Sequence, residues 1–262
     1  MPELPEVEVS RKYIDSVALD KTIKDVQVKN PKILDQISEL DLVSQLRGNR
    51  FRSTGRHGKY ILIRTERQWL TVHYGMGGSL EYFDQRELDP PHDRLLLTFE
   101  NGFYLAFDCQ RMFGRVGVAE SVEEFIHRKK LGPDALAVDS ETFIKQLQTR
   151  RGIIKSILMD QHVIAGLGNL YVDELLFQTG IHPNTRINKL EEFHMKELFE
   201  NMQRILQKTI ELEANYIKYP ESYLIQQRYK GGLCPLDKTE VESLKIGGRT
   251  TFFCPNHQKL IK

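Results

Sequence analysis

The spacing of apolar residues changes near Gly132-Pro133, and this change divides the chain into two differently built parts. Upstream, short apolar or alternating runs recur between turn signals such as Glu100-Asn101-Gly102, a pattern typical of a β-sandwich or barrel-like domain. These runs cover residues 26–28, 60–63, 69–73, 80–83, 95–99, 103–107 and 116–118. A helical spacing over residues 6–17 predicts one leading helix directly behind Pro2 and Glu3.

Helical spacing dominates after Gly132-Pro133. It predicts a helix that begins near Ser140, with that serine as its cap, and further helices over residues 152–160, 169–178 and 189–216. The longest of these helices carries one apolar stripe, which is most simply core packing. The stripe consists of Leu190, Phe193, Leu198, Met202, Ile205, Thr209 and Leu212.

Composition narrows the class of protein. No run approaches eighteen apolar residues, and the acidic N-terminus lacks the apolar core of a signal peptide. The three cysteines, Cys109, Cys234 and Cys254, cannot form a disulfide framework. We therefore expect a cytoplasmic protein without a membrane span.

Basic residues gather in two segments, although the net charge is only +1. Residues 47–67 hold seven Lys or Arg against one acid, and residues 226–262 hold seven against three. Two such segments could face one polyanion, as expected of a nucleic-acid cleft. On charge alone, two solvated faces are the alternative.

The N-terminus is a candidate nucleophile. Methionine before proline is normally removed, which leaves Pro2 as a terminal secondary amine, and on the order of a tenth of such amines are neutral at pH 7. Attack on an aldehyde-level carbon gives an iminium, an electron sink that permits elimination. Glu3 is the adjacent acid/base partner. Taken alone, however, a proline at this position is usually only a proline.

A glycine-rich turn, Ile164-Ala165-Gly166-Leu167-Gly168-Asn169, precedes the helix expected over residues 169–178. Two glycines allow close backbone approach, and the start of a helix offers unpaired N–H groups. This combination predicts a phosphate cradle, to which Asn169 adds side-chain donors. A third glycine and a preceding strand are missing, which excludes a dinucleotide fingerprint. A plain connection between two helices is the alternative.

Two residue pairs near the C-terminus have the spacing of a tetrahedral zinc site. Cys234-Pro-Leu-Asp237 is followed, sixteen residues later, by Cys254-Pro-Asn-His257, with a turn around Gly247-Gly248 between them. Only two of the four positions are cysteine. A zinc-less ribbon held by packing, with Asp237 as a surface acid, is therefore the alternative.

Together these segments resemble bacterial formamidopyrimidine-DNA glycosylases, within the formamidopyrimidine-DNA glycosylase and endonuclease VIII family. The matching motifs follow the family's order over essentially the whole chain. They are Pro2-Glu3-Leu4-Pro5-Glu6, Gly58-Lys59-Tyr60, His73-Tyr74-Gly75-Met76-Gly77-Gly78, Arg111-Met112-Phe113-Gly114, Gly166-Leu167-Gly168-Asn169 and the terminal ribbon.

The resemblance implies an α+β fold with an N-terminal β-sandwich catalytic domain over residues 1–120. A helix-two-turns-helix domain over residues 121–222 and a zinc ribbon over residues 223–262 would follow, with DNA bound between the halves. The implied protein is a monomer at the bacterial nucleoid that acts on double-stranded DNA with a damaged base or an abasic site. Its implied activity is that of a base-excision-repair glycosylase and AP lyase for oxidised purines such as 8-oxoguanine and formamidopyrimidine.

The resemblance also assigns roles to single residues. Pro2 would attack the sugar C1′ of an everted nucleotide, with Glu3 as proton donor and base. Lys59 would handle the phosphate and aid β-elimination, and Arg249 would assist δ-elimination. The family's DNA-binding positions are occupied by His92, Arg111, Arg150 and Asn169, and its zinc positions by Cys234, Asp237, Cys254 and His257.

Three residues match the family's wedge, which fills the hole left by a flipped base. They are Met76, Arg111 and Phe113. Core packing is the alternative for Met76 and Phe113.

The chain departs from the family's pattern at several positions, one of which bears on specificity. Met112 stands where a second basic residue is usual, Cys109 replaces an aspartate, and residues 214–220 replace a Gly- and Ser-rich stretch that helps to cap the flipped base. A preference for oxidised pyrimidines, as in endonuclease VIII, is therefore an alternative, although Leu4 favours the purine enzymes. A non-catalytic binder of damaged DNA is a third hypothesis, against which the intact Pro2, Glu3, Lys59 and Arg249 argue.

Overall fold

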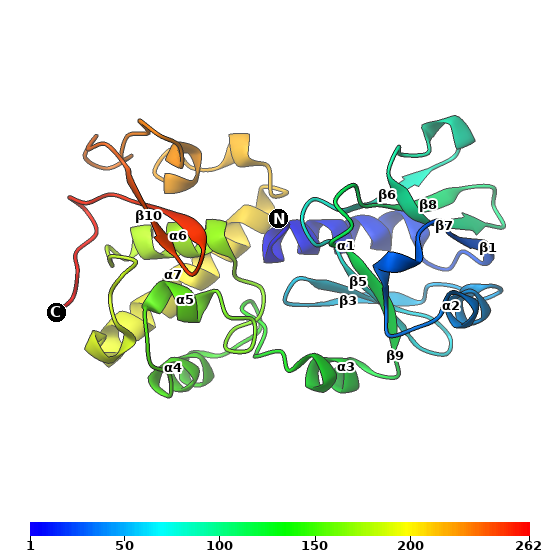
Figure 1. Ribbon diagram of the computed structural model, residues 1–262, viewed down its shortest axis with the longest axis horizontal. Coiled ribbons are helices and arrows are strands. Elements are labelled where there is room, and N and C mark those ends of the chain that lie inside the picture. The colour runs from blue at the N-terminus through cyan, green and yellow to red at the C-terminus, as the bar shows by residue number, and fades with distance from the viewer. The chain divides into compact units, whose positions relative to one another are not determined.

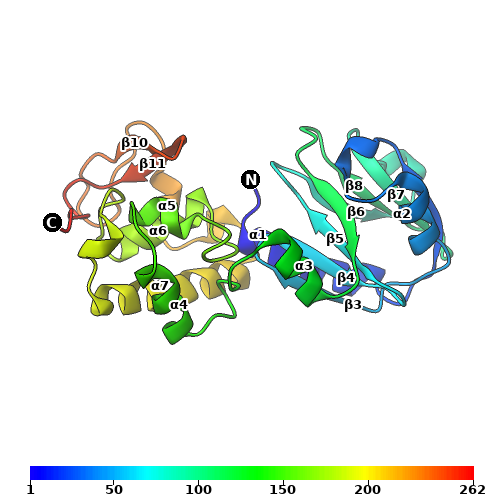
Figure 2. The same cartoon turned by 60° about the horizontal axis from the view of Figure 1, so that its bottom comes forward.

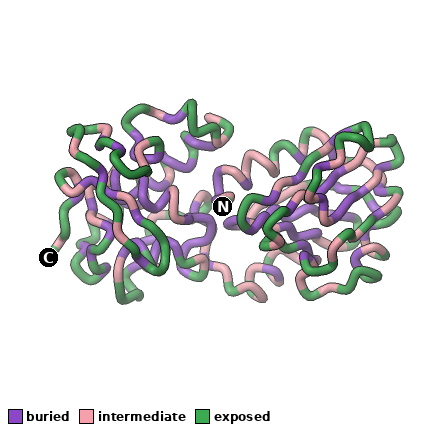
Figure 3. The backbone as a smooth tube through the Cα atoms, turned by 45° about the horizontal axis from the view of Figure 1, so that its top comes forward, coloured by how far each residue is buried: buried purple, intermediate pink, exposed green.

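The computed structural model describes residues 1–262, and the chain forms two compact units. One unit contains residues 1–2 and 6–130, and the other contains residues 3–5 and 131–262. In each unit the buried residues form the interior, while the exposed residues follow the turns and outer helix faces (Figure 3). None of the helices combines the length and the apolar character that crossing a bilayer requires.

The first unit is built around two β-sheets (Figure 1). The four-stranded sheet has the order β1-β7-β8-β6 and is antiparallel throughout. Its strands are β1 (Ile23–Val28), β6 (Ser79–Phe83), β7 (Asp93–Phe99) and β8 (Tyr104–Asp108). The five-stranded sheet has the order β2-β9-β5-β4-β3, in which only β2 and β9 are parallel. Its strands are β2 (Leu34–Asp35), β3 (Ser53–His57), β4 (Tyr60–Arg64), β5 (Trp69–His73) and β9 (Arg115–Ala119).

One apolar core joins the inner faces of the two sheets, which makes the unit a β-sandwich. Two helices contribute to the same core, α1 (Leu4–Ala18) and α2 (Glu39–Leu46). In α1 the buried positions Val7, Ile14 and Ala18 follow the helical period and form one face. The predicted sandwich and leading helix are therefore confirmed.

All seven predicted runs coincide with strands, although the run 103–107 begins one residue before β8. The sequence did not predict β2, β3, α2 or α3 (Val122–Lys129). Strand β3 has the sequence Ser-Thr-Gly-Arg-His, without apolar alternation, and forms because its backbone pairs with β4 from Ser53↔Arg64 to His57↔Tyr60. Tertiary pairing decides its conformation where side-chain pattern does not.

The second unit packs helices around its own core and ends in a two-stranded hairpin (Figures 1 and 2). The helices are α4 (Ser140–Gln148), α5 (Ile154–Leu158), α6 (Asn169–Gln178) and α7 (Glu192–Glu211), and the strands are β10 (Glu242–Ile246) and β11 (Arg249–Phe253). Gly247 and Gly248 turn the hairpin with φ of 55° and 75°, which is the backbone of a two-residue type I′ turn. Helix α6 has the predicted limits.

The expected limits of the longest helix and two residue assignments were wrong. Helix α7 ends at Glu211, because Glu213 and Ala214 take positive φ and stop the helix. Phe193 is 53% exposed and its ring contacts His194, while Met195 takes the buried place on the helix. Asp139, not Ser140, caps α4, since its carboxylate accepts the N–H of Thr142 at 2.7 Å.

Candidate active site

The carboxylate of Glu3 lies at the N-terminus of α6. Its Oε1 accepts the N–H of Leu170 at 2.9 Å and its Oε2 accepts the N–H of Tyr171 at 3.3 Å. These N–H groups belong to the first turn of a helix, where no intrahelical acceptor exists and the helix dipole stabilises an anion. Two donors of the turn predicted to cradle a phosphate therefore hold a carboxylate of the chain itself, while a phosphate contact by Asn169 stays a prediction.

Two glycines make this arrangement sterically possible. A Cβ at Gly168 would lie 2.3 Å from Cδ of Glu3, and a Cβ at Gly166 would lie 2.6 Å from Cδ1 of Leu4. Gly166 also has a φ of 117°, and its carbonyl accepts the N–H of Leu4 at 3.1 Å. The glycine-rich turn thus receives both residues that follow Pro2.

Pro2 precedes this anchored pair. Met1 is 55% exposed and Pro2 is half-buried, whereas Glu3 and Leu4 are buried. An amine created at Pro2 by removal of Met1 would therefore be covalently adjacent to a fixed carboxylate.

Arg249 lies at the tip of the hairpin, which α6 contacts along one edge. Asn169, the first residue of α6, donates from its side-chain amide to the carbonyl of Thr250 at 2.9 Å. The amide oxygen of Asn169 is buried and has no hydrogen-bond partner. Arg249 itself is exposed.

Asp173 is a buried acceptor that several donors contact. The sequence did not predict it as a site residue. Its carboxylate pairs with Lys155 of α5, accepts two hydrogen bonds from Arg228 at 2.7 and 3.0 Å, and accepts the N–H of Phe252 at 3.1 Å. Burial lowers the pKa of Lys155, and the negative charge of Asp173 opposes that shift. The only signal in the sequence is that Asp173 follows Asn169 by one helical turn.

Lys59 lies in the first unit, in the tight turn between β3 and β4, and is 5% exposed. Arg56 braces this turn, because its guanidinium donates to the carbonyl of Gly58 at 3.0 Å and to Glu8 of α1 at 3.1 Å. Burial would raise the pKa of Glu8, but hydrogen bonds from Arg11 and Arg56 outweigh it and lower that pKa. The Lys59 turn is thereby fastened to α1.

The predicted wedge residues share one exposed site in the first unit. Met76 is 41% exposed and Phe113 is 55% exposed, so core packing is excluded for both. Arg111 donates from Nε to the carbonyl of Met76 at 2.8 Å. The two loops touch through their backbones, since a Cβ at Gly75 would lie 2.3 Å from the carbonyl carbon of Phe113.

His92 and Cys109 lie at the base of the same loops. The N–H of His92 donates to Asp108 at 2.9 Å, and its carbonyl accepts the N–H of Cys109 at 3.0 Å. The buried thiol of Cys109 accepts the N–H of Gly114 at 3.3 Å. Met112 has a φ of 57° and packs its side chain against the sandwich core, so it anchors the loop that presents Phe113.

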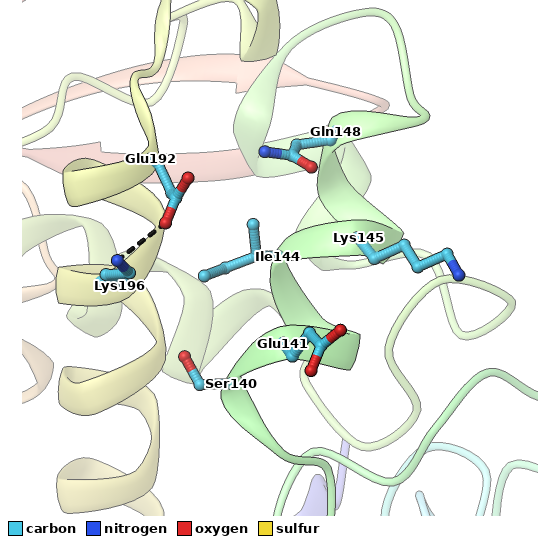
Figure 4. Close-up of a pocket in the computed structure, with 7 residues that line it drawn as sticks. All are labelled: Ser140, Glu141, Ile144, Lys145, Gln148, Glu192 and Lys196. Atoms are coloured by element: carbon cyan, nitrogen blue, oxygen red, sulfur yellow. Dashed lines mark ion pairs between the residues drawn. The ribbon is translucent and has the colours of Figure 1, made fainter.

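Arg150 is exposed and lies between α4 and α5 in the chain. Near it, a groove of about 470 Å³ runs between α4 and α7. Figure 4 shows Ile144 in the middle of this groove, the Glu192–Lys196 ion pair on one side, and Lys145 directed away. None of the predicted site residues lines it.

A candidate metal centre lies at the end of β11, where Cys254 directly follows the strand. Cys234, Asp237 and Cys254 bring their ligand atoms within 4.8 Å of one another. His257 is not in this group: its Nε2 lies 2.9 Å from the carbonyl oxygen of Phe177, and its backbone N–H donates to the Cys254 thiol at 3.3 Å. The structure therefore brings together three of the four predicted zinc ligands, and His257 is the exception.

The chemistry of this donor set fits a cation. Burial, together with the neighbouring Asp237, raises the pKa of the Cys234 thiol to about 11, so the site favours anionic sulfur only if a cation replaces the proton. If Nε2 of His257 carries the hydrogen that Phe177 accepts, Nδ1 keeps its lone pair. A ring held in this way by a backbone carbonyl is typical of zinc-ligating histidines.

Comparison with known proteins connects these features to one family. Residues 1–116 match the formamidopyrimidine-DNA glycosylase N-terminal domain, and residues 131–221 match the formamidopyrimidine-DNA glycosylase H2TH domain. The formamidopyrimidine-DNA glycosylase of Streptococcus mutans is 33% identical to the chain, and the alignment covers 99% of the chain and 100% of that protein.

Solved structures with the same fold contain DNA. A mutant of the Lactococcus lactis enzyme bound to DNA with a formamidopyrimidine lesion is 29% identical, with a TM-score of 0.89 over 98% of this chain and 100% of that one. A Lactococcus lactis complex with abasic-site DNA is also 29% identical, with a TM-score of 0.88 over 98% and 99% of the two chains.

Proposed function

The chain belongs to the formamidopyrimidine-DNA glycosylase family, and on this premise we propose that it removes oxidised purines from DNA and cleaves the abasic strand through Pro2. One observation carries the proposal above the others. The carboxylate of Glu3, next to Pro2 in the chain, is buried and held by two N–H groups of α6. An acid/base group is thus fixed beside the only position where removal of Met1 creates a secondary amine.

The reaction follows from that amine. The Pro2 nitrogen attacks C1′ of the damaged nucleotide, the C1′–N bond to the base breaks, and the base leaves with a proton. The C1′–O4′ bond of the sugar then breaks, O4′ takes a proton, and C1′ forms an iminium with the Pro2 nitrogen. The resulting iminium withdraws electrons from C2′, so a base removes the C2′ proton and the 3′ phosphate leaves by β-elimination. A second, δ-elimination releases the 5′ phosphate. We assign proton transfer to Glu3, because a carboxylate fixed by its neighbours needs no reorganisation in the transition state.

The two elimination steps require contacts to the DNA phosphates, and cationic side chains supply them. We assign Lys59 to the phosphate handled in β-elimination and Arg249 to δ-elimination. Arg111, His92, Arg150 and Asn169 are proposed DNA contacts. The exposure of Met76 and Phe113 beside Arg111 supports a wedge that replaces an everted base, since everting a base leaves a hole in the stack.

We further propose a structural zinc ion in the hairpin region. Cys234, Asp237 and Cys254 would hold it, and His257 would complete the set through Nδ1. Zinc would tie the loop around Cys234 to the end of β11 and so hold the hairpin that carries Arg249. It would take no part in the eliminations.

The proposed lesion preference concerns residues 214–220 and Leu4. Within residues 214–220, Tyr216–Lys218 form a 3-10 turn with Ile217 91% exposed, where the purine enzymes have a Gly- and Ser-rich stretch. We propose purines because Leu4 resembles the purine enzymes, whereas endonuclease VIII commonly has glycine at this position.

The proposal is tested with duplexes that carry one 8-oxoguanine, one formamidopyrimidine or one thymine glycol. Faster strand cleavage at the two purine lesions, with products of both β- and δ-elimination, would support it. Preferred cleavage at thymine glycol would assign the pyrimidine preference instead. Binding to all three without cleavage would identify a damage-binding protein and refute the enzyme.

A further inference from the structure

Helix α6 meets β11 along a backbone edge. The hairpin has only two strands, so one edge of β11 lacks a neighbouring strand. The carbonyl of Thr250 and the N–H of Phe252 both point to that edge, because backbone groups two residues apart in a strand face the same side. Asn169 donates to the first group at 2.9 Å, and Asp173 accepts from the second at 3.1 Å.

The spacing of these two hydrogen bonds determines the register of β11 along α6. Asn169 and Asp173 are four residues apart and therefore lie on one face of α6, one above the other. Their partners are two residues apart along a strand, a distance of about 6–7 Å, which is close to the pitch of a helical turn. A slip of β11 along α6 would break both hydrogen bonds at once.

Asp173 is fixed from behind as well. It is 1% exposed, pairs with the fully buried Lys155, and receives two hydrogen bonds from Arg228. The Arg228 guanidinium also lies 5.4 Å from the centre of the Phe252 ring. These contacts hold the Asp173 carboxylate, which accepts the Phe252 N–H, in a single position.

Both ends of this arrangement carry proposed catalytic groups. The first turn of α6 holds the Glu3 carboxylate, and Arg249 directly precedes Thr250 in β11. We propose that Asp173 is a positioning residue that sets Arg249 relative to Glu3 through the edge of β11, and so controls δ-elimination. This inference rests on the role of Arg249 in the proposed function.

Variants at Asp173 distinguish an effect on the position of Arg249 from an effect on the stability of the protein. Asp173→Asn keeps an oxygen that accepts the Phe252 N–H, but it leaves Lys155 without its counter-charge. The double variant Lys155→Met with Asp173→Leu removes the fully buried Lys155–Asp173 pair and the acceptor together, and it leaves the guanidinium of Arg228, whose side chain is 14% exposed, to solvent. Buried ion pairs replaced by apolar residues of similar volume commonly preserve stability. We expect the single variant to melt at a lower temperature yet keep its product ratio, and the double variant to show the reverse.

The donor side provides an independent pair. Phe252→Pro removes the N–H at the free edge, where proline is tolerated, while Phe252→Leu removes the ring and keeps the N–H. We expect only the proline variant to lose δ-elimination.

The measurement is the ratio of δ- to β-elimination products on abasic duplex DNA, with borohydride trapping of the same samples. We expect this ratio to fall by at least about tenfold in the Lys155→Met/Asp173→Leu and Phe252→Pro proteins, given the steep dependence of rate on position, with trapping retained. A wild-type ratio in those two proteins would overturn the inference, as would a ratio that follows melting temperature across the four. Failure of the wild type to trap would instead contradict the proposed function.

Discussion

The Glu3 carboxylate and Gly168 are packed so closely that any side chain at position 168 would occupy the place of the carboxyl group. A Cβ built there would lie 2.3 Å from Cδ and 2.4 Å from Oε1 of Glu3. The backbone φ of Gly168 is −139°, which any residue adopts. Glycine is therefore needed at this position for a steric reason, namely to leave room for the Glu3 carboxyl group.

Gly168→Ala is accordingly expected to displace Glu3 and to lower glycosylase and lyase rates by about a hundredfold or more. Its cost in unfolding free energy should be about 1–3 kcal/mol, the usual range for an overpacked site. Single-turnover cleavage and urea unfolding check the two values. Gly55→Ala is the matched control, because a Cβ at Gly55 would meet nothing closer than 3.9 Å. Equal rates in the two variants would contradict the role assigned to Gly168.

Phe113→Ala tests the wedge. The ring is 55% exposed, so its removal should change the unfolding free energy by no more than about 0.5 kcal/mol. Excision of a damaged base should nevertheless slow by about tenfold, because the everted state loses the group that fills the stack. Cleavage at a pre-formed abasic site should slow less. A variant that loses stability but excises normally would return Phe113 to a packing role.

Protonation of His73 should destabilise the first unit in mild acid. Burial and the nearby positive charges of Lys59, Arg115 and Lys129 together lower the pKa of His73 to about 4, while Asp35 opposes this shift. Between pH 4 and 6.5 the unfolded chain therefore binds a proton that the folded chain does not. Stability should rise with pH across this window and be lost as the pH falls through it.

His73→Asn isolates the effect. The imidazole Nδ1 accepts the N–H of Gly75 at 3.1 Å, and an asparagine oxygen can replace that acceptor without titrating. Between pH 7 and 4.5 the wild type should lose on the order of 1–2 kcal/mol more unfolding free energy than the variant. Urea unfolding at the two pH values measures the difference. Parallel losses would show that His73 does not titrate in this range.

Metal analysis tests the zinc proposal. We expect about one zinc ion per chain and a loss of zinc affinity of at least about tenfold in Asp237→Ala. His257→Gln should weaken zinc binding as well if Nδ1 completes the set. Protein that purifies and folds without metal under zinc-replete conditions would indicate a ribbon held by packing.

The sequence predicted the fold where side-chain pattern and structure coincide. Seven strands and helix α6 appear at the expected places because their apolar residues face a core. Strand β3 could not be predicted, since pairing with β4 alone makes it a strand. The early end of α7 depends on the positive φ of Glu213 and Ala214, for which neither residue type is typical.

For the site, motifs identified residues but not their partners. The glycine-rich turn was correctly read as an anion site, yet nothing local indicated that Glu3, more than 160 residues away in sequence, would fill it. Asp173 was missed for the same reason: its donors come from Lys155, Arg228 and Phe252, which only the fold brings together. Residue types indicate which chemistry a side chain can perform, whereas contacts between residues distant in sequence determine which groups lie next to it.

The central claim is that the amine of Pro2 performs the chemistry, and borohydride trapping on abasic duplex DNA tests it most directly. Reduction of the iminium fixes the enzyme to C1′, so wild type should give one covalent adduct whose N-terminal peptide carries the sugar. Pro2→Gly, which leaves a primary amine, should lose most of this adduct, and a chain that retains Met1 should lose all of it. An adduct on a lysine with Pro2 unmodified, or no adduct at all, would contradict the account.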